Sequence, residues 1–255
     1  MMLSRMNLSQ RYGKSDLSVL TDEELRRFVR CPGADPKGDV PLCWELLYRL
    51  EPELYDRLVR AEQLHPAIVD WLPARMDRIV EVGAGTGRLT LALLGRADQI
   101  IAVEPAAPMR RILIRRLAQA PHGRGVTVMH GFFDTLPVPT HWAEMVVSCS
   151  ALTRDDEHGG DAGLVEMERV CRPGGCVVII WPNNLDWLAD RGYRYKSFSG
   201  QMWMQFSSLA EAVELVEIFY PHAVAEVRRR KMSSVPYEVL GINPPRDLAV
   251  KVMPT

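Results

Sequence analysis

The sequence predicts an α/β fold built around a doubly wound parallel sheet. Short runs rich in β-branched residues, which suit strands buried on both faces, alternate with amphipathic stretches of helical length. One such run leads directly into three glycines at alternate positions, Gly83, Gly85 and Gly87. A strand, a glycine loop and a helix in this order form the ligand-binding crevice of open α/β sheets.

The predicted elements follow one another at the spacing of a single sheet. Strands are expected at five places, residues 79–82, 99–105, 126–133, 145–148 and 176–181. Helices are expected between and after them, at residues 86–94, 108–120, 162–171 and 208–230. Residues 235–242 and 247–252 are then predicted to form a closing, hairpin-like pair around the turn INPPRD.

The region before the first strand is expected to be helical. Thr21 is a predicted N-cap with Glu24 in the capping-box position, which places a short helix at residues 21–30. Residues 43–60 are expected to form one or two further helices, whereas the polar residues 1–20 are expected to be mobile. We therefore divide the 255 residues into an N-terminal helical extension, residues 1–65, and one domain, residues 66–255.

Composition and charge limit the classes of function. A net charge of -1 argues against a broad nucleic-acid surface. Two basic clusters are predicted to be solvated helix faces, namely Arg110, Arg111, Arg115 and Arg116, and residues 228–231. No apolar run is long enough to span a membrane and the N-terminus lacks a signal-peptide core, so we expect a cytoplasmic protein, monomeric or homodimeric. Five cysteines without a CxxC pair favour neither a disulfide framework nor a zinc site.

The residues of the glycine loop argue against a dinucleotide ligand. The dinucleotide fingerprint needs a third glycine at the position that Arg88 occupies here. The carboxylate of Glu81, which enters the loop, would repel a pyrophosphate and attract an ammonium group. This combination favours a zwitterionic, sulfonium-bearing ligand.

The segment EVGAGTG, residues 81–87, resembles the first motif of the class I S-adenosylmethionine-dependent methyltransferases. The segment VCRPGG, residues 170–175, is similar to the RVLKPGG signature of small-molecule methyltransferases of the ubiquinone-biosynthesis type. The resemblance covers roughly residues 66 to 255. It implies a Rossmann-like, seven-stranded doubly wound sheet with antiparallel sixth and seventh strands, and S-adenosylmethionine as the cofactor.

The resemblance also assigns the cofactor residues. Glu81, Gly83, Gly85 and Gly87 would surround the methionine half, while Glu104, at the end of the second strand, would accept hydrogen bonds from the ribose hydroxyls. Asp134 would receive the adenine amino group, and Phe132 or Phe133 would flank the ring, although either is equally suited to the core. Thr86, Pro105 and Ser148 complete the expected cofactor set.

Two aromatic-rich regions are candidates for the acceptor pocket. Related methyltransferases use N-terminal helices as a lid, where Tyr48 and Tyr55 would face the acceptor beside Trp44. After the fifth strand, the segment 181–206 supplies Trp181, Trp187 and Trp203 in a chain with only 7% aromatic residues. Packing of the helices and of this segment is the competing explanation for each of these side chains.

The loop after the fourth strand contains the candidate catalytic residues. His158 is a possible base, because its unperturbed pKa of about 6.5 lies near neutrality. Asp155, Asp156 or Glu157 could serve instead. The same loop also suits a solvated lead-in to the next helix, with Asp161 as N-cap. Asp155 or Asp156 with Asn183 or Asn184 matches the magnesium site of catechol-type methyltransferases only loosely, so no metal is expected.

These observations together predict methyl transfer from S-adenosylmethionine to a small molecule, with O-methylation favoured slightly over C- or N-methylation. An RNA- or protein-directed methyltransferase and a non-catalytic S-adenosylmethionine-binding protein remain the alternatives. The motif NPPR at Asn243 lies in the turn between the last two predicted strands rather than at the end of the fourth strand, so it does not indicate an amino-directed nucleic-acid enzyme.

Overall fold

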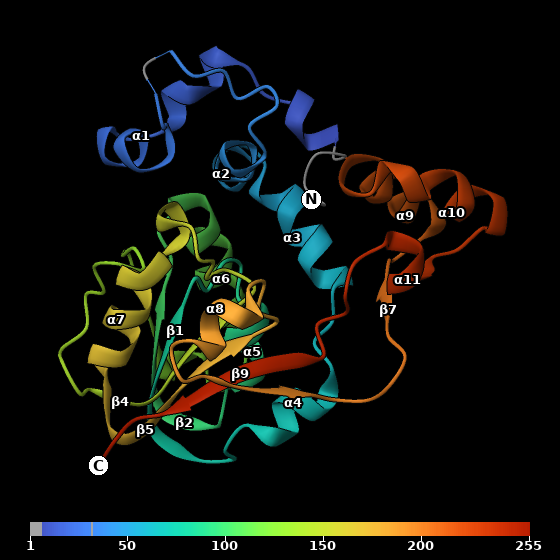
Figure 1. Ribbon diagram of the computed structural model, residues 1–255. Coiled ribbons are helices and arrows are strands. Elements are labelled where there is room, and N and C mark those ends of the chain that lie inside the picture. Colours follow the sequence, from blue (N-terminus) through green and yellow to red (C-terminus); the bar gives the residue numbers. More distant parts are fainter. Residues whose placement is uncertain (1–6, 32) are drawn as a thin grey trace. The chain divides into compact units, whose positions relative to one another are not determined.

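The computed structural model describes residues 7–31 and 33–255. The chain divides into two compact units, whose elements are labelled in Figure 1. One, the sheet unit, consists of Leu64–Ser199 and Pro245–Thr255, and the other, the helical unit, consists of Met1–Gln63 and Gly200–Pro244. The sequence-based division at residue 65 assigned residues 200–244 to the second domain. In the structure these residues belong to the helical unit.

A seven-stranded sheet forms the centre of the sheet unit. Its strands are β1 (Met76–Val82), β2 (Ala97–Val103), β3 (Val126–Met129), β4 (Ala143–Cys149), β5 (Cys171–Ile180), β6 (Arg194–Ser197) and β9 (Asp247–Val252). They lie in the order β3-β2-β1-β4-β5-β9-β6, and β9 runs antiparallel to both of its neighbours. The predicted doubly wound, seven-stranded sheet is confirmed.

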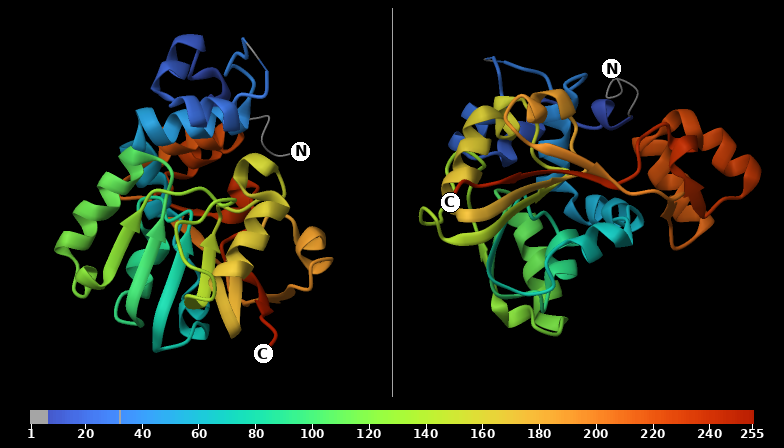
Figure 2. Two further views of the ribbon diagram at one scale, coloured as in Figure 1. Left: turned by 90° about the vertical axis from the view of Figure 1, so that its left-hand side faces the viewer. Right: turned by 60° about the horizontal axis from the view of Figure 1, so that its bottom comes forward.

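Helices cover both faces of this sheet, as Figure 2 shows. They are α4 (Pro66–Trp71), α5 (Arg88–Leu93), α6 (Ala107–Gln119), α7 (Gly160–Val170) and α8 (Leu185–Ala189). Neighbouring residues of β1 point to opposite faces: Val80 packs with Met167 of α7, whereas Ile79 packs with Leu89 of α5. Burial on both faces explains why the central strands are continuous apolar runs.

The closing strands differ from the prediction at residues 235–242. The partner of β9 at the sheet edge is β6, whereas β8 (Ser234–Pro236) pairs with β7 (Trp203–Gln205) in a separate two-stranded sheet. Pro236 ends β8 and precedes the short helix α11 (Tyr237–Leu240). All four residues of β6 are exposed, so this strand has no hydrophobic pattern by which the sequence would reveal it.

The helical unit contains the predicted N-terminal helices. After η2 (Asn7–Gln10) and η3 (Lys14–Val19) come α1 (Asp22–Phe28), α2 (Val40–Leu50) and α3 (Pro52–Ala61), and the later segment adds α9 (Leu209–Phe219), η6 (Pro221–Ala223) and α10 (Val224–Arg230). The capping box of Thr21 and Glu24 is present. The long helix predicted at residues 208–230 is interrupted, because Pro221 cannot continue the hydrogen-bond ladder of α9.

The expectation of a mobile N-terminus is wrong for the part that the structure describes. Leu8 and Tyr12 are buried, and the amide of Asn7 donates a hydrogen bond to the carbonyl of Glu217. Residues 1–6 of that segment lie outside the described residues. Among the described residues, no helix has the length and apolar character needed to cross a membrane.

Candidate functional site

The glycine loop after β1 takes a backbone path that only glycine suits. Gly83, Gly85 and Gly87 have φ angles of 74°, 57° and 97°. A Cβ on Gly83 would lie 2.5 Å from the Cβ of Ala151, and one on Gly87 would lie 2.5 Å from Cδ1 of Leu113. The loop is therefore packed closely against its neighbours at the point where β1 and β4 diverge, the crevice in which such sheets bind ligands.

Glu104 joins the glycine loop to the end of β2. Its Oε2 accepts a hydrogen bond from the backbone N–H of Gly85 (3.0 Å), and its Oε1 accepts one from Ala106 (2.8 Å). Each oxygen of a carboxylate has further acceptor capacity, so these bonds orient Glu104 without exhausting it. The side chain that the sequence predicts for ribose binding is thus held beside the loop.

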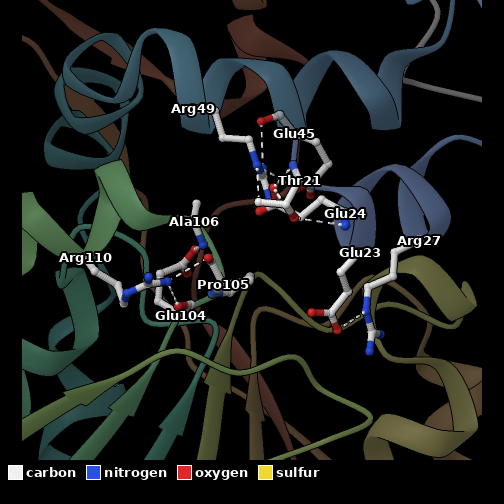
Figure 3. Close-up of polar contacts among 10 residues, drawn as sticks. All are labelled: Thr21, Glu23, Glu24, Arg27, Glu45, Arg49, Glu104, Pro105, Ala106 and Arg110. Carbon is white, nitrogen blue, oxygen red and sulfur yellow. Dashed lines mark hydrogen bonds and ion pairs between the residues drawn. The ribbon is translucent and has the colours of Figure 1, made fainter. Parts of the chain in front are cut away.

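Helix α6 braces these two segments with arginines. Arg110 donates to the carbonyls of Glu104 and Pro105 (both 2.6 Å), as Figure 3 shows, and Arg116 donates to the carbonyl of Thr86 (3.0 Å). The interpretation of this basic cluster as a wholly solvated face is therefore wrong for two of its members. Arg111 and Arg115 do lie exposed.

Glu81 is a fully buried carboxyl group. Its side chain is 1% exposed, and its Oε2 accepts a hydrogen bond from Oγ1 of Thr90 (2.5 Å). Burial, which disfavours the charged form, raises the pKa of Glu81 to about 8. The sequence identified Glu81 but gave no sign of its hydrogen-bond donor in the following helix.

Two hydroxyls among the predicted cofactor residues are buried without a hydrogen-bond partner in the described part of the chain. They are Oγ1 of Thr86, in the glycine loop, and Oγ of Ser148, near the end of β4. An unsatisfied buried hydroxyl costs free energy, so a polar ligand group nearby would be stabilising. This observation fits a ligand at the carboxyl ends of β1 and β4.

The predicted adenine segment lies beside the same loop. Phe133 is half-buried and packs against the core, with its ring 3.3 Å from the position of a Cβ on Gly83. Phe132 is buried and contacts the ring of His130 edge-on at 5.3 Å between centroids. Asp134 accepts a hydrogen bond from Oγ1 of Thr135 (3.2 Å). Of the two phenylalanines, Phe133 is therefore the one that reaches the glycine loop.

Arg88 connects the glycine loop to the ends of β4 and β5. Its Nη2 donates to Sγ of Cys149 (3.4 Å), and its guanidinium lies over the ring of Trp181, 5.6 Å from the centroid. Trp181 has a φ of 53°, a left-handed conformation that turns the chain away from β5. In the sequence, Arg88 is notable only because it replaces the third glycine of the dinucleotide pattern. In the structure it lies at the ligand-binding crevice, against Cys149 and Trp181.

The other predicted acceptor residues belong to two different units. Trp187 of the sheet unit donates its indole N–H to Asp161 (3.0 Å), and Arg191 lies over its ring. Tyr48 and Tyr55 of the helical unit meet edge-on at 4.8 Å, and Trp44 adjoins both. Trp203, in β7 of the helical unit, is 39% exposed. Asp161 and Arg191 therefore hold the indole of Trp187, whereas Trp203 presents part of its ring to solvent.

The predicted catalytic loop forms a short turn, η5 (Asp156–His158). Asp155 is exposed and His158 is half-buried, and the backbone N–H of His158 donates to the carbonyl of Asp155 (2.9 Å). Asp161 is not the N-cap of α7: the helix starts at Gly160, Gly159 is its N-cap, and Asp161 bonds Trp187 and Arg191 instead. Within residues 7–31 and 33–255, no three His, Cys, Asp or Glu side chains gather as a metal site would require.

Part of the chain is similar to known methyltransferases. Residues 79–175 match a family model described as a methyltransferase domain. An uncharacterized methyltransferase of Mycobacterium tuberculosis is 30% identical over 131 residues, which are 50% of this chain and 50% of that protein. The 2-methyl-6-phytyl-1,4-hydroquinone methyltransferase 2 of Oryza sativa is 29% identical over 179 residues, 66% of this chain and 47% of the rice protein.

The chain spans about half the length of the curated relatives that it matches first. Among solved structures, the YcgJ protein of Bacillus subtilis aligns with a TM-score of 0.50 at 13% identity, covering 74% of this chain and 97% of that one. At this identity the likeness concerns the fold alone. The residues that match the methyltransferase model, 79–175, include the glycine loop and the central strands of the sheet.

Proposed function

We propose, from the match of residues 79–175 to a methyltransferase domain, that the protein is a class I, S-adenosylmethionine-dependent methyltransferase. Its acceptor would be a small molecule, methylated preferably on oxygen. The observation that supports this most is the glycine loop with Glu81 and Glu104 on either side of it. S-adenosylmethionine has an ammonium group and two ribose hydroxyls. A carboxyl group can bind each of these parts, Glu81 the ammonium and Glu104 the hydroxyls.

The cofactor supplies an activated methyl group on a sulfonium sulfur. Glu81 would bind the ammonium group, Glu104 the ribose, and Asp134 with Phe133 the adenine, while Gly83, Gly85, Thr86, Gly87, Pro105 and Ser148 shape the crevice. In the transfer, the acceptor lone pair forms the new bond to carbon, the carbon–sulfur bond breaks, and sulfur keeps the electron pair. The protein chiefly aligns the two reactants and excludes water.

We propose His158 as the base that takes the acceptor proton, with Asp155 as the alternative. Both belong to the loop that follows β4, the strand next to β1. A general base contributes on the order of a hundredfold or more to a rate. His158→Gln should therefore lower kcat by about a hundredfold and remove a limb of the pH profile, whereas an unchanged profile would exclude His158.

For the acceptor, we propose contacts with Trp181 at the end of β5 and with Tyr48, Tyr55, Trp187 and Trp203. The name of the rice relative gives a hydroquinone as its acceptor, and aromatic side chains suit such a planar, apolar ring. Replacement of Trp203 by Ala should raise the acceptor KM and leave the affinity for S-adenosylmethionine unchanged. An unaltered KM would remove Trp203 from the pocket.

The decisive experiment is a calorimetric titration with S-adenosylmethionine, followed by a transfer assay with isotopically labelled methyl groups. The assay should offer hydroquinones and other small phenols, bulk RNA and a protein extract as acceptors. Label in a phenol supports the proposal, label in RNA or protein supports a macromolecular acceptor, and binding without any transfer indicates a non-catalytic protein. Absence of binding would contradict all three.

We propose that the protein acts in the cytoplasm, as a monomer or homodimer, and without a nucleic-acid or membrane partner. The net charge of -1 favours this. Sedimentation with and without RNA or anionic vesicles tests the assembly state and both partners together.

A further inference from the structure

Thr90 contacts the buried acid of the proposed cofactor site. It lies in α5, the helix that follows the glycine loop, and is fully buried. Its Oγ1 donates to Oε2 of Glu81 over 2.5 Å, so a neutral hydroxyl, rather than a cation, is the hydrogen-bond donor to this carboxyl group. A short hydrogen bond between two buried groups fixes the rotamers of both.

Two charged groups face Glu81 from the neighbouring segments. Arg88, at the start of α5, favours its ionised form, and Glu104, after β2, opposes ionisation. Burial is the larger effect and raises the pKa of Glu81 to about 8. Without a ligand, the carboxyl group is therefore mainly protonated at neutral pH.

We propose that Thr90 is a positioning residue that fixes Glu81 for the ammonium group of the cofactor, and that binding of this ammonium group releases one proton from Glu81. The inference rests on the function proposed above. On binding, the O–H bond of Glu81 breaks, the carboxylate keeps the electron pair, the proton passes to the buffer, and the new carboxylate pairs with the ammonium. A buried cation stabilises a buried carboxylate far more than water-exposed charges stabilise each other.

The proton release is measured by titrating the whole protein with S-adenosylmethionine at neutral pH in phosphate and in Tris, whose ionisation enthalpies differ. The apparent binding enthalpy of the wild type should depend on the buffer, and the dependence should correspond to nearly one proton released. Glu81→Gln, which cannot ionise, should show no such dependence. A wild type that binds with the same enthalpy in both buffers would overturn the proton release and leave the proposed function intact.

The positioning role is measured with Thr90→Val, which keeps the shape of the side chain but removes the hydroxyl, and with Thr90→Ser as the matched control. The valine variant should bind S-adenosylmethionine about tenfold more weakly. The hydrogen bond from Thr90 lowers the pKa of Glu81, so its loss in the valine variant should raise that pKa. The pH at which the affinity reaches its plateau should therefore rise as well. Thr90→Ser should restore both values.

A double-mutant cycle distinguishes this role from a merely structural one. In the Glu81→Gln background, Thr90→Val should change the affinity by less than about twofold. The same tenfold loss in that background would overturn the proposal, because Thr90 would then act independently of Glu81. A wild type that binds no S-adenosylmethionine would instead refute the proposed function, and the inference with it.

Discussion

At the scale of single residues, the site depends on positions where the side chain is either missing or buried. Gly83 and Gly87 have left-handed backbones and no room for a Cβ. Glu81, which precedes the loop, and Thr90, which follows it, form a buried polar pair. Single substitutions at these four positions should therefore strongly affect the stability of the protein and its binding of the cofactor.

Gly83→Ala should destabilise the protein by about 2 kcal/mol or more and weaken cofactor binding, because the new Cβ meets Ala151 and the φ of 74° disfavours alanine. Urea unfolding and calorimetric titration measure the two effects. Gly125→Ala is the matched control in the same unit, since its Cβ would lie 3.4 Å from the carbonyl oxygen of Asp98. Equal losses in both variants would contradict the argument.

The ligand-free protein should lose stability as the pH rises from about 4.5 to about 8. Over this range, Glu81 keeps its proton in the folded protein but loses it in the unfolded chain. Its contribution to the free energy of unfolding therefore falls by up to about 1.4 kcal/mol per pH unit. Glu81→Gln should remove this slope in urea unfolding experiments, whereas the exposed Glu238→Gln should not. An unchanged slope in Glu81→Gln would show that another group titrates.

At the scale of elements, α6 holds two loops through main-chain carbonyls. Arg110 contacts Glu104 and Pro105, and Arg116 contacts Thr86. Arg116→Met should therefore weaken binding of S-adenosylmethionine several-fold, since each such charged hydrogen bond contributes about 1.5–3 kcal/mol. Arg111→Met, on the exposed side of the same helix, is the control in the same titration. Equal affinities in both variants would contradict the bracing role.

Helices α1 and α2 are joined by a buried group of charges, drawn in Figure 3. Arg49, whose side chain is 4% exposed, bonds Glu24 of α1 and Glu45 of its own helix at 2.7 Å each. Arg49→Met should cost about 3–5 kcal/mol in urea unfolding, because two buried carboxylates lose their cation. Glu23→Gln, in the exposed pair with Arg27, should cost less than about 1 kcal/mol. A similar cost in both would be evidence against the buried group.

At the scale of the whole molecule, the helical unit is assembled from two distant segments. The ring of Trp44 stacks on Phe219 at 5.5 Å, Arg57 bonds Glu211 and Glu214, and Tyr220 bonds Glu62. Residues 200–244 therefore depend on residues near the start of the chain for their burial.

Trp44→Ala should destabilise this unit by about 3 kcal/mol, since a large aromatic contact is lost. It should also increase proteolysis within residues 200–244, although Trp44 lies in the other segment. Limited proteolysis with identification of the cleavage sites measures this. Cleavage confined to residues 7–63 would show that the two segments unfold separately.

The buried strands were predictable from the sequence because their apolar runs and the glycine loop are local signals. The exposed strand β6 was not, since its pairing with β9 is made by the backbone alone. Glu81 and Glu104 were found by position, whereas Thr90, Arg110 and Arg116 act through contacts that cross the fold.

The sequence by itself determined the fold class and the order of the central strands' motifs, because glycine spacing and strand burial depend on neighbouring residues. Only the tertiary structure decided which donors hold each acid, that burial raises the pKa of Glu81, and that residues 200–244 join the helical unit. Those features arise from contacts between residues far apart in the chain, where solvent exclusion and packing, rather than local propensity, set the energies.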